Sequence, residues 1–237
     1  MTLVPLFEDV DLLVINKPPG LVVNRAVTVA GETVQDWAEK KVKSSQFIVH
    51  SEEEKTFVDR AGIVHRLDKE TSGVLLIAKT PQAFTELQRQ FKERLVKKTY
   101  LALIHGKLVP PVGEIRAPVG RLPWNRERFG VVPGGKEALT KYKVHGSSFI
   151  VHGQEVTLVE LYPATGRTHQ IRVHLKYINH PIVGDYLYAG RKVSRADRTW
   201  VRRVMLHAAK VTFRHPTSGE LVTVEAPIPA DMKALNI

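Results

Sequence analysis

The sequence predicts a single α+β domain over residues 1–237. Segments typical of strands and helices are mixed along the chain without the strict β–α–β repeat of a parallel sheet. The chain has 237 residues, 43% of them apolar and 25% charged, which is typical of a globular protein with a sizeable core. A polar stretch at 43–60 resembles a linker, but the strand before it is too short to form a separate domain.

The first elements are predicted from apolar spacing and turn residues. Residues 12–20, LLVINKPPG, are typical of a strand that ends in a Pro-Pro-Gly turn. Residues 31–42 place four apolar side chains near helical spacing and are expected to form a helix. Residues 43–60, with the acidic triplet at 52–54, are expected to form a solvated loop. The apolar run at 74–80, VLLIAKT, suits a buried strand.

A helix is predicted to begin at Thr80-Pro81, because threonine can cap a helix and proline suits its first turn. Four apolar residues then recur at helical spacing and are expected to form its buried face: Phe84, Leu87, Phe91 and Leu95. The next strand is expected at residues 99–106, TYLALIHG.

The second half of the chain begins with a basic loop at 121–135, RLPWNRERFGVVPGG. Residues 140–163 are expected to form strands around a turn, and 168–178 a helix that Thr168 can cap. Residues 210–227 contain a Pro-Thr-Ser-Gly turn between apolar segments and are expected to form a hairpin.

The net charge of +11 is unevenly distributed. Residues 1–60 carry 7 basic and 10 acidic side chains, whereas residues 61–237 carry 28 and 14, a net charge of +14. Such an excess indicates a polyanionic partner, most often a nucleic acid. A generally basic protein without such a partner is the alternative.

Cysteine is absent, which excludes disulfides, thiolate zinc sites and iron–sulfur clusters and is compatible with a reducing compartment. No run reaches the roughly 18 apolar residues that a membrane span needs. Glu8, Asp9 and Asp11 interrupt the apolar N-terminus, which does not resemble a signal peptide. We therefore expect a cytoplasmic protein that does not cross a membrane.

Asp68 lies in the charged stretch HRLDKETSG, directly before the predicted buried strand. His65, Arg66 and Lys69 flank it, and nearby positive charge keeps a carboxylate ionised. An ionised carboxylate can act as a nucleophile or a base. An ordinary surface ion pair is the alternative interpretation of the same residues.

A second charged stretch, ATGRTHQIRVH, covers residues 164–174. Arg167 precedes the predicted helix, and His169 and Arg172 lie three residues apart on neighbouring parts of one face. Arg172 stands between two apolar residues, and an arginine drawn into the interior needs a carboxylate partner, for which Asp68 is a candidate. A phosphate-binding cluster and a structural ion pair are the alternatives.

These stretches together with KKTY at 97–100 closely resemble the RluA-type pseudouridine synthases. The matching stretches are HRLDKETSG and TGRTHQIRVHL, and their combination is far more specific than a lone glycine motif. Flanking segments also resemble the family, so the resemblance covers nearly the whole chain: KPPG at 17–20, HPIVGD at 180–185, and LHA with FRHPTSGE within 206–220.

The resemblance implies a mainly antiparallel or mixed β-sheet flanked by helices and loops, with a central RNA-binding cleft. It implies isomerisation of uridine in rRNA or tRNA: the N1–C1′ bond breaks and C1′ is rejoined to C5. Asp68 is implied to be the nucleophile or base, and Tyr100 to stack on the base and assist proton transfer at C5. Arg172 is implied to pair with the aspartate, and Arg66 to enter the RNA stack.

The physical demands of this reaction agree with those roles. A stacked uridine must be flipped out at a cost of about a few kcal/mol, and an aromatic ring contributes about 1–3 kcal/mol per stacked base. Tyr100 alone would also fit a core position. The residues predicted to bind RNA are His65, Arg66, Arg121, Arg126, Arg128, Arg167 and His169. Trp124 and Phe129 are interleaved with three of these arginines, although a solvated loop would have the same composition.

We expect no metal, cofactor or small-molecule cosubstrate, because the chain has no HExxH pattern and no nucleotide-binding loop. We expect a monomer, without the N-terminal S4-type RNA-binding domain that several relatives carry. A non-catalytic RNA-binding protein is the main alternative function. A glycosidic hydrolase is a weaker one, because it would typically need two carboxylates.

Overall fold

The computed structural model describes residues 3–43 and 47–235. The chain divides into two compact units, one formed by residues 1–97 and 209–227 and the other by residues 98–208 and 228–237. Each unit combines β-strands with helices, which confirms the predicted α+β class. The two units are described separately.

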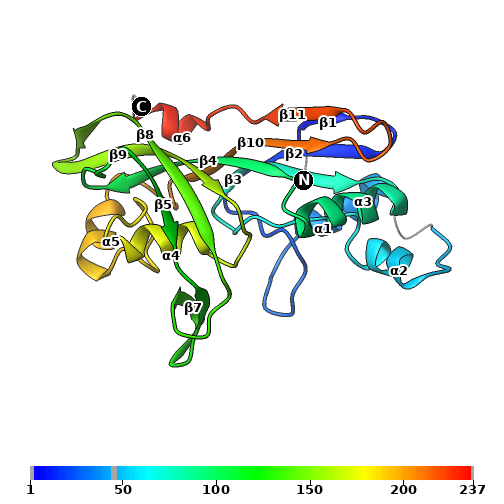
Figure 1. Cartoon of the computed structure of the whole chain (residues 1–237), viewed down its shortest axis with the longest axis horizontal. Helices are drawn as coiled ribbons and strands as arrows, with labels where there is room; N and C mark the ends of the chain where they lie inside the picture. Colours follow the sequence, from blue (N-terminus) through cyan, green and yellow to red (C-terminus); the bar gives the residue numbers. More distant parts are fainter. Residues whose placement is uncertain (1–2, 44–46, 236–237) are drawn as a thin grey trace. The chain divides into compact units, whose positions relative to one another are not determined.

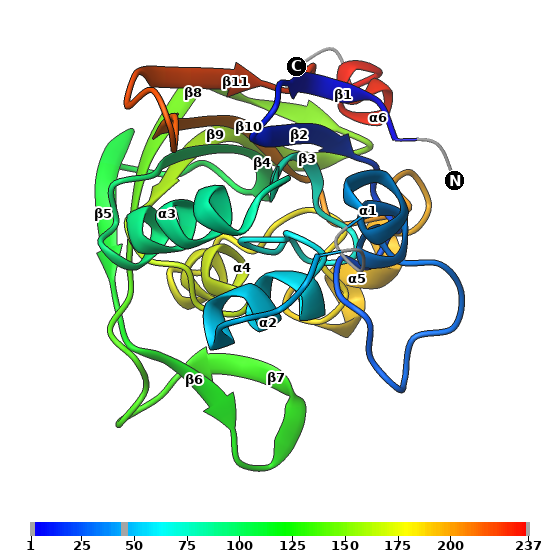
Figure 2. The same cartoon turned by 90° about the vertical axis from the view of Figure 1, so that its right-hand side faces the viewer.

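The first unit has three helices on one face of its strands (Figures 1 and 2). Strands β1, β2 and β3 are neighbours in that order and antiparallel, and β10 pairs with β11 in the same manner. The elements are β1 (Pro5–Glu8), β2 (Leu12–Lys17), α1 (Val34–Val42), α2 (Glu52–Asp59), β3 (Ser72–Ala78), α3 (Pro81–Lys92), most of β10 (Leu206–Arg214) and β11 (Leu221–Glu225).

The second unit is built on an antiparallel sheet with the strand order β4-β9-β8-β5, accompanied by the separate hairpin β6–β7. Figures 1 and 2 show this hairpin extending away from the sheet of its unit. The elements are β4 (Lys97–His105), β5 (Val112–Arg116), β6 (Val119–Leu122), β7 (Asn125–Val131), β8 (Leu139–Val151), β9 (Gln154–Pro163), α4 (Gln170–Tyr177), α5 (Arg191–Asp197) and α6 (Ala230–Lys233).

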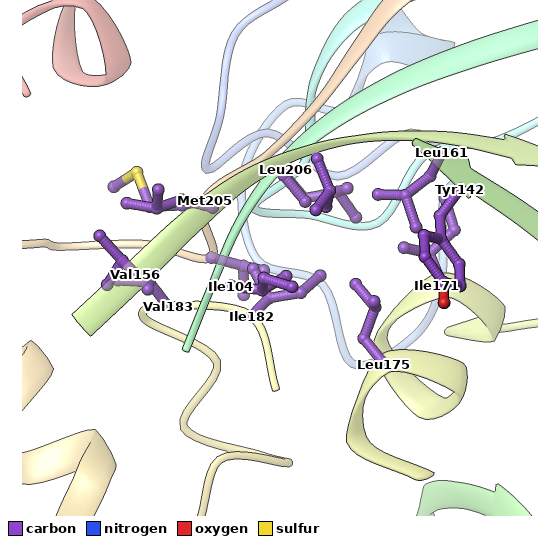
Figure 3. Close-up of a cluster of buried hydrophobic side chains, with 14 of the residues drawn as sticks. Ile104, Tyr142, Val156, Leu161, Ile171, Leu175, Ile182, Val183, Met205 and Leu206 are labelled. Carbon is purple, nitrogen blue, oxygen red and sulfur yellow. The ribbon is translucent and has the colours of Figure 1, made fainter. Parts of the chain in front are cut away.

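The core of the second unit lies between its sheet and α4. Ile171 and Leu175, one turn apart on α4, are buried together with Ile104 of β4 and Leu161 of β9. Figure 3 shows these side chains pointing toward one another. The apolar side chains of Ile171 and Leu175 therefore anchor α4 to the sheet.

The acidic stretch predicted as part of a loop is helix α2, so that prediction was wrong. Ser51 caps the helix by accepting a hydrogen bond from the amide of Glu54, and the acidic triplet occupies the first turn, where negative charge suits the helix dipole. Phe57 is fully buried and packs edge-on against Phe84 of α3. A single inward aromatic residue gives too weak a periodicity to reveal so short a helix.

The buried face predicted for the next helix was correct at Phe84 and Leu87 and wrong at Leu95. Helix α3 begins after the predicted cap, Thr80, but ends at Lys92. Arg94 adopts a positive φ of 62°, which turns the chain out of the helix and leaves Leu95 49% exposed.

Residues 121–131, predicted as part of a basic loop, lie largely in the hairpin of β6 and β7. Its register pairs Arg121 with Phe129 across a tight turn at Pro123-Trp124. A two-stranded hairpin is marginal by itself, so its stability depends on packing against the rest of its unit. Phe129 and Val131 pack against a small cluster that includes Val173 of α4.

The longest helix in the described part of the chain, α3, has 12 residues. No helix in residues 3–43 or 47–235 combines the length and apolar character needed to cross a bilayer.

Candidate functional site

Asp68 stands in a turn of the first unit that leads directly into β3. Its carbonyl oxygen accepts a hydrogen bond from the amide of Thr71 at 3.1 Å, which closes the turn. Strand β3, which follows, is buried along its whole length. The turn is thus joined to the rigid centre of its unit.

Lys17 fixes this turn from the side. Its side chain is fully buried, and Nζ donates to the carbonyl oxygens of Pro18, Leu21 and Lys69 at 2.9, 2.9 and 3.0 Å. A buried ammonium needs such acceptors, so the two turns that supply them are held together. The amide of Gly20 also donates to the Lys69 carbonyl at 2.9 Å. The sequence predicted KPPG as a turn and as a segment that resembles the family, but the role of Lys17 was missed.

The residues around Asp68 alternate in burial. Leu67 is only 4% exposed, whereas Arg66 before it is exposed and Asp68 after it is partly exposed. Leu67 therefore anchors the segment while its two charged neighbours remain accessible. This is the arrangement that a carboxylate acting on an external ligand requires.

His65 supports the same segment from behind. Its Nε2 accepts a hydrogen bond from the amide of Leu76 in β3 at 3.0 Å, and its ring stacks on Phe91 of α3 with centroids 4.8 Å apart. Because Nε2 is an acceptor, the neutral ring carries its proton on Nδ1. The ring therefore has a bracing role, and RNA contact by His65 stays a prediction.

Arg172 in α4 of the second unit forms a buried, bidentate ion pair with Asp185. Nε and Nη2 lie 2.7 and 2.8 Å from the two carboxylate oxygens, and the side chains are 7% and 1% exposed. The guanidinium also lies over the ring of Tyr188, 5.0 Å from its centroid. The sequence predicted that Arg172 needs a carboxylate, but Asp185 was missed. Pairing of Arg172 with Asp68 stays a prediction.

The turn before α4 is held by Gln170. Its Oε1 accepts from the Thr165 hydroxyl at 2.7 Å and the Arg167 amide at 3.0 Å, while its Nε2 donates to the Leu139 carbonyl and the Thr140 hydroxyl, both at 3.0 Å. Two of these hydrogen bonds hold the turn and the other two reach the start of β8, so the side chain links the turn to the strand. The position of Arg167 is therefore set by a buried amide.

His169, rather than the predicted Thr168, is the residue at the start of α4. It has a φ of 56° and makes no capping hydrogen bond through its side chain. Instead, its Nδ1 lies 2.8 Å from the hydroxyl of Tyr188, which also accepts a hydrogen bond from the amide of Phe129 at 3.0 Å. Tyr188, which sequence reasoning missed, thus joins α4 to the hairpin.

Tyr100 lies on β4, paired with Leu161 of β9, and is partly buried against the core of its unit. Lys98 stands two residues earlier, on the same face of the strand. Its Nζ lies 3.5 Å from the Thr165 carbonyl, and burial lowers the pKa of Lys98 to about 8. No ion pair joins Lys98 to a carboxylate of the described residues.

The chain as a whole is similar to known proteins. A family model described as RNA pseudouridylate synthase matches residues 11–177. The ribosomal large subunit pseudouridine synthase D of Neisseria meningitidis is 43% identical over 98% of the chain.

The chain belongs to the RNA pseudouridylate synthase family.

Other pseudouridine synthases agree with this assignment and confirm the resemblance seen in the motifs. An uncharacterized RNA pseudouridine synthase of Bacillus subtilis is 39% identical over 97% of the chain and 70% of its own length. The solved structure of human RNA pseudouridylate synthase domain containing 1 is 31% identical, with a TM-score of 0.74 over 95% of this chain and 83% of that one. The chain spans about 60% of the length of the Neisseria relative.

The motifs that resemble pseudouridine synthases are distributed over both units, whereas the net positive charge belongs to one unit. The first unit contains 16 lysines and arginines and 16 aspartates and glutamates, a net charge of zero. The second contains 19 and 8, so the entire net charge of +11 belongs to it. The sequence-based boundary at residue 61 placed this excess only approximately, because residues 209–227 return to the first unit.

The hairpin of the second unit carries several of the predicted RNA-binding residues. Arg121 lies over the ring of Phe129, 4.8 Å from its centroid, and Phe129 meets the ring of His169 edge-on at 5.5 Å. Arg128 is exposed, and Trp124 at the turn is 79% exposed. The side chain of Arg126 lies outside the described residues. The structure therefore groups Arg121 with His169, which the sequence had placed 48 residues apart.

His174, in the second charged stretch, is fully buried. Nε2 contacts the Ala117 carbonyl at 3.0 Å and Nδ1 the Thr140 hydroxyl at 2.9 Å, and burial lowers its pKa. Because a carbonyl can only accept, Nε2 carries the proton of the neutral ring. Within the described residues, no three His, Asp or Glu side chains are grouped as metal ligands.

Proposed function

We propose that this chain isomerises uridine in RNA to pseudouridine, with Asp68 as the nucleophile or base. The observation that carries the proposal is the combination of family membership with an Asp68 turn that is rigidly held and partly exposed. The N1–C1′ bond breaks, a C5–C1′ bond forms, and the C5 proton is released while N1 gains one. The atoms balance without an oxidant or a cosubstrate.

Three other residues are proposed to support the reaction. Exposed Arg66 fits the role of filling the space that the uridine leaves in the RNA stack. Tyr100 provides a ring for stacking on the base and for proton transfer at C5. Arg172 is proposed to favour the ionised form of Asp68, in addition to its pair with Asp185.

Lys98 is proposed to bind the phosphate of the target nucleotide. Its ammonium is largely desolvated, has no carboxylate partner among the described residues and lies on the strand face that carries Tyr100. A desolvated cation gains strongly from an anionic ligand, because Coulomb interactions strengthen where water is excluded. The family motif KKTY supplies this lysine two residues before the tyrosine.

Large-subunit rRNA is the proposed substrate, because several relatives are named as ribosomal large subunit pseudouridine synthases. Transfer RNA is the alternative. The proposed protein is cytoplasmic and acts as a monomer.

Release of tritium from RNA labelled at C5 of uridine tests the activity. We expect release from large-subunit rRNA, and none after Asp68→Ala. Inactivity of the wild-type chain on total rRNA and tRNA would refute the enzymatic proposal. Unchanged RNA binding with no turnover would favour the non-catalytic alternative, which the basic second unit also fits.

A further inference from the structure

A cluster of exposed cations lies in the second unit, outside every residue discussed above. We call it the α5 patch, and it consists of Arg191, Lys192, Arg195, Arg198 and Arg202. Arg191, Arg195 and Arg198 are three to four residues apart, which places them along one side of α5; Lys192 follows Arg191, and Arg202 lies just after the turn that continues the helix. The opposite side, with Ser194, Asp197 and Val201, is buried.

No carboxylate in residues 3–43 or 47–235 forms an ion pair with the α5 patch. Asp197 is the sole carboxylate in residues 191–202, and it is fully buried. Its Oδ2 accepts from the amide of Gly184 at 2.9 Å and lies 3.0 Å from Nε2 of His105.

Such a cluster does not stabilise its helix. Like charges three or four residues apart cost about 0.2–0.5 kcal/mol per pair. Helix α3 shows the usual remedy, because Arg89 there is paired with both Glu86 and Glu93. A run of uncompensated cations therefore indicates an external anionic ligand.

An exposed aromatic ring borders the α5 patch. The guanidinium of Arg198 lies over Tyr186, 5.5 Å from the ring centroid, and Tyr186 is 45% exposed. Cations beside an aromatic face are typical of surfaces that bind nucleic acids, where phosphates meet the cations and bases or sugars meet the ring. A surface for small anions would not need the ring.

Within the second unit, the position of the α5 patch separates it from Tyr100. Asp197 connects α5 to His105, at the end of β4. Tyr100 lies five residues earlier on that strand, which corresponds to about 17 Å. An RNA that reaches both therefore contacts the patch with nucleotides outside the target uridine.

We propose that the α5 patch binds backbone phosphates of the RNA substrate at a distance from the modified uridine. This inference rests on the proposed function for the identity of the RNA. From Arg191 to Arg198 the helix rises about 10 Å, so the patch is long enough to contact more than one backbone phosphate. The patch would thus add affinity for long or folded RNA without taking part in the reaction.

The test compares two triple variants with the same loss of charge. Arg195→Gln, Arg198→Gln and Arg202→Gln are combined in one, and the exposed Lys41→Gln, Lys55→Gln and Lys92→Gln of the neutral first unit in the control. The probe is an in vitro transcript of large-subunit rRNA, and its Kd is measured by filter binding between 50 and 200 mM KCl. Thermal melts confirm that each variant is folded, and a single Arg202→Gln variant is measured beside them.

We expect the patch variant to bind about tenfold more weakly at 100 mM KCl, with the slope of log K against log salt reduced by about 2–3. The control should keep the wild-type slope. Equal Kd values and slopes for the two variants would overturn the proposal. So would a patch variant that retains RNA binding and loses binding to phosphatidylglycerol vesicles, which would identify a membrane surface instead.

Tritium release separates this inference from the proposed function. At saturating transcript, the patch variant should keep the wild-type turnover with a raised KM. A wild-type chain that binds the transcript through the patch without releasing tritium would refute the proposed function and leave the patch standing. A wild-type chain that releases tritium, with KM unchanged in the patch variant, would refute the patch alone.

Discussion

The two units of the chain differ in charge and in how they hold their charged groups. The first unit is neutral overall and fixes the Asp68 turn through one buried cation, Lys17, whose ammonium donates to three carbonyl oxygens. The second carries the whole net charge and buries an arginine against a carboxylate, Asp185. The basic character of the chain therefore belongs to the second unit, while the proposed nucleophile or base, Asp68, lies in the first.

The largest predicted effect is on the ion pair of the second unit. Asp185→Ala leaves the guanidinium of Arg172 buried without this partner, and we expect a loss of about 3–5 kcal/mol in the free energy of unfolding. Urea denaturation measures it. Glu114→Ala, which removes an exposed ion pair with Arg116, is the control and should cost about 1 kcal/mol or less. Equal effects would contradict the contrast between buried and exposed pairs.

A smaller effect is predicted for the anchor of the first unit. Lys17→Met keeps an apolar stem but leaves buried carbonyl oxygens without their donor, which costs about 2–4 kcal/mol. Because the Asp68 turn loses its brace, turnover should fall further than the stability change alone explains at temperatures where the variant is folded. Lys41→Met, at an exposed position, serves as the control. Full turnover in folded Lys17→Met would show that the anchor does not position Asp68.

The smallest effect concerns the pH dependence of substrate binding. With a pKa of about 8, Lys98 loses its charge as the pH rises through that value, so KM for the RNA should increase between pH 7 and 9. Lys98→Arg keeps its charge and should flatten this increase.

The same lysine gives a stability test without RNA. Between pH 8 and 10.5 the unfolded chain binds more protons than the folded chain, so the contribution of Lys98 should make the free energy of unfolding rise with pH. In Lys98→Met, this rise in the free energy of unfolding between pH 8 and 10.5 should be absent.

Local sequence patterns predicted the elements that depend on local chemistry. Thr80-Pro81 marked the start of α3, and the apolar run at 74–80 contained most of the buried strand β3. Helix α2 was not predicted, because Phe57 is its single buried residue. The hairpin within 121–135 was not predicted, because its stability comes from contacts with residues far away in the sequence, such as the hydrogen bond between the Phe129 amide and Tyr188.

The residues proposed for the candidate site come from sequence motifs, and their roles stay predictions. Motifs singled out Asp68, Tyr100 and Arg172 because their spacing resembles a known family. Asp185 and Lys17 could not be derived, since nothing local shows that one carboxylate faces Arg172 or that one lysine is buried. Such partners are set by tertiary packing, which brings together residues far apart in the chain.

Tritium release by the wild type and Asp68→Asn, measured side by side on large-subunit rRNA, tests the central proposal most directly. The substitution keeps the size of the side chain and removes its negative charge. We expect the wild type to release tritium and the rate of release to fall at least about a thousandfold in the variant, while RNA affinity and melting temperature are retained. Release by Asp68→Asn at the wild-type rate would contradict the proposal that this carboxylate carries the chemistry.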